Sequence, residues 1–185
     1  AAGLLFAGCK PGDDKGRTWS VYKADAGSSS FSPLDQISVS NINQLKPAWT
    51  FTISDLPKDA QPSNSQCNPI IVDGIMYATS AKRMAYAIDA ATGKQIWAHD
   101  PYDGGGGGGV GRGVTYWEDG DDKRIFYAAG TNLVAVGALT GKTIESFGED
   151  GKVNLNLGLR DDPDKIAVTM TSPGIIYKDL IIVGS

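Results

Sequence analysis

The sequence predicts an all-β protein, and three observations support that prediction. The chain contains short apolar runs such as 69–72 (PIIV), 75–78 (IMYA), 124–128 (RIFYA) and 179–183 (DLIIV), each next to turn residues. Glycine accounts for 24 of the 185 residues, which is typical of a chain with many turns. No long stretch shows the apolar period of a helix.

Composition excludes several classes of protein. The formal net charge is −4, whereas a nucleic-acid-binding domain would normally carry a basic patch. Hydrophobic residues make up 41% of the chain, which is enough to build a core and too many for a disordered chain. No apolar run approaches the ~20 residues of a membrane-spanning helix. We therefore expect a folded protein that does not bind nucleic acid.

The first nine residues (AAGLLFAGC) predict the end of a bacterial lipoprotein signal peptide. Small residues directly before Cys9 are typical of a lipidation site, and residues 10–18 then read as a linker. The alternative is an ordinary secretory signal with a chance cysteine. Lipidation of Cys9 would leave Cys67 without a disulfide partner, and Cys67 is then expected to be a small buried hydrophobe. These features predict a periplasmic protein that a lipid anchor attaches to the membrane.

An internal repeat refines the fold class. The segment 87–97 (AIDAATGKQIW) recurs at 135–145 (AVGALTGKTIE), and Trp49 precedes Trp97 by the same spacing. A repeat of ~40–50 residues with about four strands is the signature of a β-propeller blade. Residues 19–185 hold about three and a half such units. We therefore predict a partial β-propeller of about three to four blades, the N-terminal part of a larger ring.

The repeat motif resembles that of a known family. It matches the tryptophan-docking motif of bacterial quinoprotein dehydrogenases, which use pyrroloquinoline quinone (PQQ) and have eight blades. The resemblance implies that the tryptophan packs flat between adjacent blades, where the Thr-Gly-Lys turn caps it. The second copy has Gly137 and Glu145 in place of Asp and Trp, so we expect a looser junction there. The matching residues of the first copy are Ala87, Asp89, Thr92, Gly93, Lys94 and Trp97.

The resemblance runs from Trp19 to Ser185 and is greatest to the membrane-associated, glucose-dehydrogenase-like branch. Adjacent cysteines precede the cofactor-binding arginine in the alcohol branch, whereas this chain has Gly108 to Gly111 at that place. The segments that carry the resemblance are 31–37 (FSPLDQI), 41–46 (NINQLK), 112–117 (RGVTYW), 146–148 (SFG) and 171–173 (TSP).

PQQ is a planar ortho-quinone with three carboxylates, so its site needs cationic and hydroxyl donors. The resemblance assigns cofactor contacts to Gln66, Arg112, Thr171 and Ser185. From the sequence alone, Arg112 could instead be a surface residue of the glycine-rich loop, and Gln66 a polar residue before a proline turn. Thr169 lies one register away from Thr171 and is the alternative hydroxyl.

The family resemblance also implies a calcium ion and a catalytic aspartate, both expected beyond Ser185. It implies oxidation of a sugar or alcohol, with electrons passed to a quinone or cytochrome. The alternative is a PQQ-repeat propeller without cofactor that serves as a binding scaffold in the envelope.

Other signals have simpler explanations. The run 104–109 satisfies G-x-G-x-x-G, but no strand-to-helix unit follows it, which argues against a dinucleotide site. One histidine and two cysteines are too few for a zinc site. His99 is expected to be a solvated turn residue. The acidic clusters 121–122 and 161–164 lack calcium-loop spacing and are expected to lie in turns.

Overall fold

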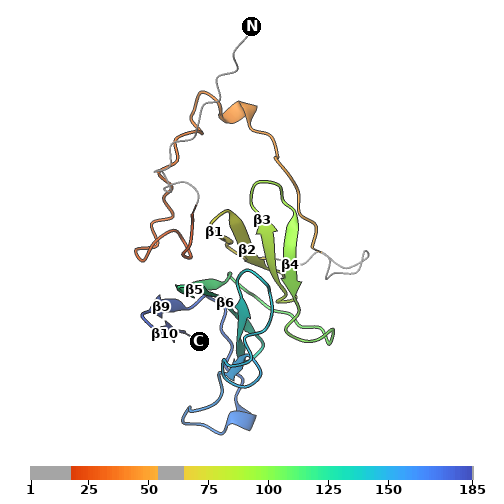
Figure 1. The fold of residues 1–185 in the computed structure, drawn as a ribbon. Helices are drawn as coiled ribbons and strands as arrows, with labels where there is room; N and C mark the ends of the chain where they lie inside the picture. Colours follow the sequence, from red (N-terminus) through yellow and green to blue (C-terminus); the bar gives the residue numbers. More distant parts are fainter. Residues whose placement is uncertain (1–17, 54–64, 185) are drawn as a thin grey trace.

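The structure is a computed structural model that describes residues 18–53 and 65–184. Its strands form two four-stranded antiparallel sheets and a two-stranded sheet beside the second (Figure 1). The segment 18–53 carries the 3₁₀ turn η2 (Ile42–Gln44), and a second 3₁₀ turn, η3 (Pro163–Lys165), precedes the two-stranded sheet. Within these described ranges, no helix is long and apolar enough to cross a membrane. The predicted all-β class is confirmed.

Each four-stranded sheet is a meander in which consecutive strands pair. The first turn, between β1 and β2, is built by Asp73 and Gly74, whose φ angles of 51° and 79° suit a type I′ hairpin. The strands of the first sheet are β1 (Ile70–Val72), β2 (Ile75–Thr79), β3 (Ala85–Asp89) and β4 (Gln95–His99). Those of the second are β5 (Thr115–Asp119), β6 (Asp122–Ala129), β7 (Asn132–Gly137) and β8 (Lys152–Asn154). The third, two-stranded sheet consists of β9 (Ile175–Tyr177) and β10 (Leu180–Ile182).

The second sheet buries both of its faces. Because side chains alternate along a strand, β6 sends Ile125 and Tyr127 into one core cluster, shared with the first sheet. It sends Phe126 and Ala128 into another, which includes Met170 and contacts the third sheet. A sheet buried on both faces is stable only between neighbours, as in a stack of propeller blades.

The tryptophan of each repeat lies on the turn of the next repeat. The Trp97 indole N–H donates to the Ala138 carbonyl at 2.8 Å, and the Trp49 indole N–H donates to the Ala90 carbonyl at 3.1 Å. A Cβ added to Gly93 would lie 2.6–2.7 Å from ring atoms of Trp49, so each indole rests directly on a glycine. Gly141 has the same relation to Trp97.

Asp89 organises the turn on which Trp49 rests. Its carboxylate accepts hydrogen bonds from the Thr92 hydroxyl and from the backbone N–H groups of Ala91 and Thr92. These bonds, above all the one from the Thr92 hydroxyl, lower the pKa of Asp89. The second copy lacks this carboxylate, because Gly137 stands in its place.

The outer strand of the second sheet is split, unlike that of the first. After the first Thr-Gly-Lys turn, β4 continues directly as a strand from Gln95. After the second, the chain makes a single bridge from Thr143 to Val136, and β8 then pairs with the remainder of β7. The departure of the second copy from the motif, at Glu145, lies where this strand is interrupted.

The prediction for His99 is wrong. His99 ends β4 and is half-buried, with Nδ1 2.6 Å from the Tyr127 hydroxyl and Nε2 3.1 Å from the Thr143 hydroxyl. Both partners belong to the second repeat, so the ring links the two sheets. The sequence could not show this, because the two hydroxyls lie 28 and 44 residues away.

We expect Gly93→Ala to destabilise the protein more than Gly74→Ala. Both glycines have positive φ, of 73° and 79°, so both substitutions carry a backbone cost of about 1–2 kcal/mol. Only at Gly93 would the new methyl group meet an indole, which adds about 1–3 kcal/mol of overpacking. Thermal unfolding of the two variants measures the difference, and equal melting temperatures would show that Trp49 does not rest on Gly93.

We expect His99 to make stability fall as the pH drops below about 6.5. Burial, assisted by Lys152, lowers the pKa of His99 below its ordinary value of 6.5, so the unfolded chain binds the proton more readily than the folded one. The contribution is therefore complete above about pH 6.5 and is lost as the pH falls toward the lower pKa of the folded state. Melting temperatures of wild type and His99→Gln between pH 7.5 and 5.5 measure it, and parallel pH profiles for the two proteins would contradict it.

Candidate cofactor site

Three chain segments meet just before the first strands of the three sheets. Asn68 donates its backbone N–H to the Arg112 carbonyl at 3.0 Å, and Arg112 donates its own to the Thr171 carbonyl at 2.9 Å. These bonds place the segments before β1, β5 and β9 side by side, although Arg112 and Thr171 are 59 residues apart along the chain. The segments that carry Gln66, Arg112 and Thr171, three of the predicted cofactor contacts, are thus brought together.

The close approach of these segments depends on small residues. Gly113 has a φ of 135°, and a Cβ there would lie 2.7 Å from the Asn68 carbonyl oxygen. Pro69 follows Asn68 and favours an extended conformation at that residue, which aligns it with the neighbouring segment. On the other side, the Thr115 hydroxyl donates to the Gly174 carbonyl at 2.8 Å and ties β5 to the segment before β9.

Hydroxyl groups hold the Arg112 side chain. Its Nη1 donates to Thr171 Oγ1 at 2.9 Å and to Ser172 Oγ at 3.3 Å. The side chain is half-buried, and none of the ion pairs among the described residues involves it. A guanidinium has five N–H donors, so the Arg112 cation keeps donors for an anionic group. This arrangement suits a carboxylate, which an arginine can bind with two parallel hydrogen bonds.

The structure places the other predicted cofactor contacts in different environments. Gln66 is exposed, and its backbone carbonyl accepts a hydrogen bond from the Asn68 side chain at 3.3 Å. Thr169 is exposed, and the hydroxyl that reaches Arg112 is that of Thr171. Ser185 and Cys9 lie outside the described residues.

Cys67 is half-buried beside this site. Its Sγ accepts the backbone N–H of Thr79 at 3.2 Å, and burial raises the pKa of the thiol. The residue is therefore held as a neutral thiol at ordinary pH, close to the small hydrophobe that the sequence predicts.

Sequence patterns do not mark the residues around the Arg112 backbone. Arg83, from the turn between β2 and β3, donates from Nη2 to the carbonyl of Val110, two residues before Arg112. Buried Thr79 and Arg83 both lie against Gly111, where an added Cβ would be 3.3 Å from Thr79 Oγ1 and 3.2 Å from Arg83 Nη1. Neither residue stands in a repeated or family-like motif, so the sequence alone does not identify them as site residues.

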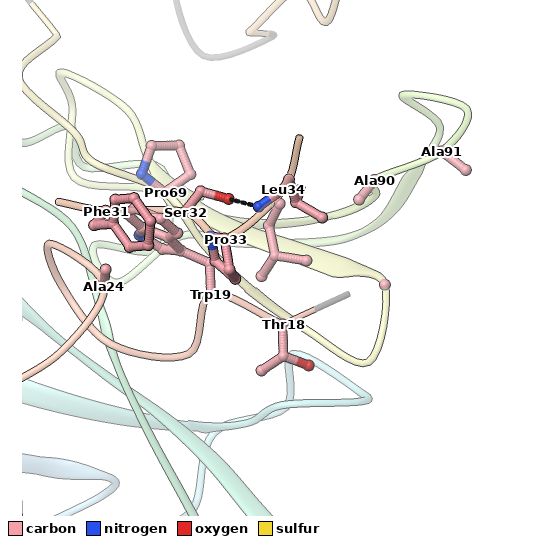
Figure 2. Close-up of a pocket in the computed structure, with 12 residues that line it drawn as sticks. Thr18, Trp19, Ala24, Phe31, Ser32, Pro33, Leu34, Pro69, Ala90 and Ala91 are labelled. Carbon is pink, nitrogen blue, oxygen red and sulfur yellow. Dashed lines mark hydrogen bonds between the residues drawn. The ribbon is translucent and has the colours of Figure 1, made fainter. Parts of the chain in front are cut away.

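A pocket of about 680 Å³ opens elsewhere, between the segment 18–34 and β1, and Figure 2 shows it. Its walls are apolar or neutral, with Trp19, Phe31, Pro33 and Leu34 from the N-terminal segment and Pro69 from just before β1. No charged side chain lines it, and it contains none of the predicted cofactor contacts. A tricarboxylate would find no cation there, so the Arg112 site is the better candidate.

Metal ligands do not gather in the described part of the chain. No group of three or more His, Cys, Asp or Glu side chains within residues 18–53 and 65–184 could hold a metal ion. The acidic residues of the expected turns have local roles: Asp122 pairs with Arg124, and Asp162 pairs with Lys165 and caps η3.

Comparisons with known proteins agree with this architecture. The family model described as "Glucose/ethanol/alcohol dehydrogenase, beta-propeller domain", with PQQ as its label, matches residues 19–185. The quinohemoprotein alcohol dehydrogenase from Comamonas testosteroni superposes with a TM-score of 0.71 at 26% identity, over 92% of this chain and 23% of that one. These matches and the stacked sheets confirm the predicted partial propeller.

Curated relatives include both branches of the predicted family. The dehydrogenase subunit of the quinone alcohol dehydrogenase of Gluconacetobacter polyoxogenes is 37% identical over 140 residues, which are 72% of this chain and 18% of the relative. The quinoprotein glucose dehydrogenase of Escherichia coli (strain K12) is 29% identical over 184 residues, 90% of this chain and 23% of the relative. The chain thus spans about a quarter or less of the length of these relatives. On the match over residues 19–185, the chain belongs to the family of PQQ-dependent quinoprotein dehydrogenases, within their β-propeller domain.

Proposed function

We propose that the protein oxidises a CH–OH group of a sugar or alcohol with bound PQQ, in the bacterial envelope. The observation that carries the proposal is the Arg112 cation, which two hydroxyls hold at the meeting point of three blade segments. The relatives support it, because their names describe alcohol and glucose dehydrogenases that use a quinone. Electrons would then pass to a quinone or cytochrome.

The residues present fit PQQ at one of its carboxylates. Arg112 has no acidic partner in the described ranges, so a carboxylate of the cofactor would supply the missing countercharge. Thr171 and Ser172 fix the guanidinium from the side, while the backbone bonds of Arg112 fix its segment. When bound, PQQ supplies the ortho-quinone that accepts two electrons from the substrate.

The cofactor is proposed to be bound and oriented by Arg112 and Thr171 and, from the neighbouring segment, by Gln66. Ser185, which follows the third sheet, is proposed as a further hydroxyl contact by resemblance. Calcium is proposed by resemblance alone, because the described residues hold no group of three or more His, Cys, Asp or Glu side chains that could bind it.

We expect Arg112→Ala to weaken PQQ binding by about ten- to a hundredfold, since a hydrogen bond to a charged group contributes about 1.5–3 kcal/mol. Arg112→Lys should restore only part of the affinity, because an ammonium group cannot make the two-pronged contact. Titration of PQQ into the apo form of the full gene product measures the affinity. Arg160→Ala, a change at an exposed arginine, is the control.

Two outcomes would contradict this proposal. Unchanged affinity in Arg112→Ala would show that Arg112 does not bind the cofactor. A wild-type protein that binds no PQQ would favour the alternative, a propeller that serves as a scaffold in the envelope.

We further propose that a lipid on Cys9 anchors the protein to the membrane. Wild-type gene product expressed in a Gram-negative host should then be found in the membrane fraction, and Cys9→Ser should move it to the soluble fraction. Cys67→Ser is the matched control, since Cys67 lies in the folded part of the chain, just before β1, and its substitution should leave the distribution unchanged. Soluble wild-type protein that begins downstream of Cys9 would overturn the proposal.

A further inference from the structure

Arg83 is the one buried non-glycine residue with a positive φ angle among the described residues. Its φ is 67°, and only 6% of its surface is exposed. For a residue with a Cβ, this left-handed conformation costs about 1–2 kcal/mol, and glycine would avoid the cost. The other non-glycine residues with positive φ are exposed or half-buried, mostly Asp, Ser or Lys in surface turns. The position therefore retains a long cationic side chain where the backbone alone would favour glycine.

The guanidinium of Arg83 binds backbone carbonyls. Nη1 donates to Ala128 at 3.2 Å and to Met170 at 3.5 Å, and Nη2 donates to Val110. None of the ion pairs in the described ranges involves Arg83. Burial lowers the pKa of Arg83, but the group starts from such a high pKa that it stays charged. Carbonyl oxygens from three separate parts of the chain thus take the place of water around this buried charge.

Two of these carbonyls lie next to the candidate cofactor contacts. Val110 is two residues before Arg112, and Met170 directly precedes Thr171. Gly111 connects Val110 to Arg112 in contact with the guanidinium, since an added Cβ would lie 3.2 Å from Nη1. One side chain from the turn between β2 and β3 therefore holds the backbone of both segments that meet at Arg112.

We propose that Arg83 is a positioning residue of the cofactor site, which sets the placement of Arg112 and Thr171 relative to each other. This inference rests on the proposed function, because it assigns Arg83 to the same site. Arg83 acts through the Val110 and Met170 carbonyls, so its effect on PQQ is transmitted by Arg112 and Thr171. A purely structural role would lower stability and leave the affinity of the folded protein for PQQ unchanged.

The test is PQQ titration of apo-protein, followed by protein fluorescence, in the full gene product at a temperature where every variant is folded. Arg83→Gly relieves the strained backbone and removes the guanidinium, and Arg83→Met keeps the bulk of the side chain. Both should weaken PQQ binding about tenfold, because small displacements of binding groups are costly. Arg83→Lys should recover part of this, and Arg160→Met, at an exposed arginine, should change nothing.

A double-mutant cycle distinguishes positioning from an independent effect. If Arg83 acts through Arg112, the loss from Arg83→Gly should largely disappear in the Arg112→Ala background. Fully additive losses would overturn the proposal, as would wild-type affinity in Arg83→Gly. Absence of PQQ binding by wild type would instead overturn the proposed function, so the two failures are distinguishable.

Gly111→Ala keeps the proposal testable if the Arg83 variants do not fold. The new methyl group would press on Nη1 at 3.2 Å without removing the charge. We expect the same loss of PQQ affinity at a smaller size, about two- to fivefold, as a slight displacement of the binding groups would cause. Gly108→Ala is the control in the same loop, since its φ is not positive and an added Cβ would come no closer than 4.0 Å, to the Ala81 carbonyl oxygen. Equal affinities of Gly111→Ala and Gly108→Ala would contradict a role for the Arg83 contact.

Discussion

The contact of a tryptophan with a glycine of the next repeat is the constraint on which the rest of the structure depends. A single four-stranded sheet cannot bury both of its faces, so each sheet needs a neighbour at a fixed distance and angle. Gly93 and Gly141 let the Trp49 and Trp97 rings lie directly on the following turn, and an indole N–H bond fixes the direction of each ring. Because both indole bonds span 41 residues, the same spatial relation recurs along the chain. The aromatic ring contributes area, while the hydrogen bond contributes orientation.

The candidate site follows from this stacking. Once consecutive sheets are fixed, the segments that precede their first strands lie side by side, and the Asn68, Arg112 and Thr171 backbones pair. A cation on one segment then meets hydroxyls on the next without any local motif that contains both. The buried guanidinium of Arg83 donates to the backbone carbonyls of Val110 and Met170, one next to each of the residues that meet at the site.

Much of the fold could be predicted from the sequence, because its signals are local. Apolar runs, the Asp73-Gly74 turn and the repeat each involve residues close in sequence, and strands lie where these signals predict them. The prediction fails where a contact spans repeats: His99 resembles a turn residue in isolation, yet its partners lie on the next sheet. Arg112 and Thr171 could be paired only through resemblance to a family, since their separation of 59 residues follows no period. Arg83 gave no signal at all, because its conformation and its carbonyl partners exist only in the folded chain.

The site segments are unequally spaced along the sequence, and this spacing has an evolutionary consequence. Thr171 follows Arg112 by 59 residues, which is longer than the distance from Gln66 to Arg112 and longer than the constant spacing of the tryptophan-bearing turns. The extra length lies in connections such as the one that carries η3, outside the stacked sheets. Insertions and deletions in such connections can therefore accumulate while the packing of the stacked sheets is inherited unchanged. Such a division lets descendants of one ancestral scaffold acquire different specificities by varying loops alone.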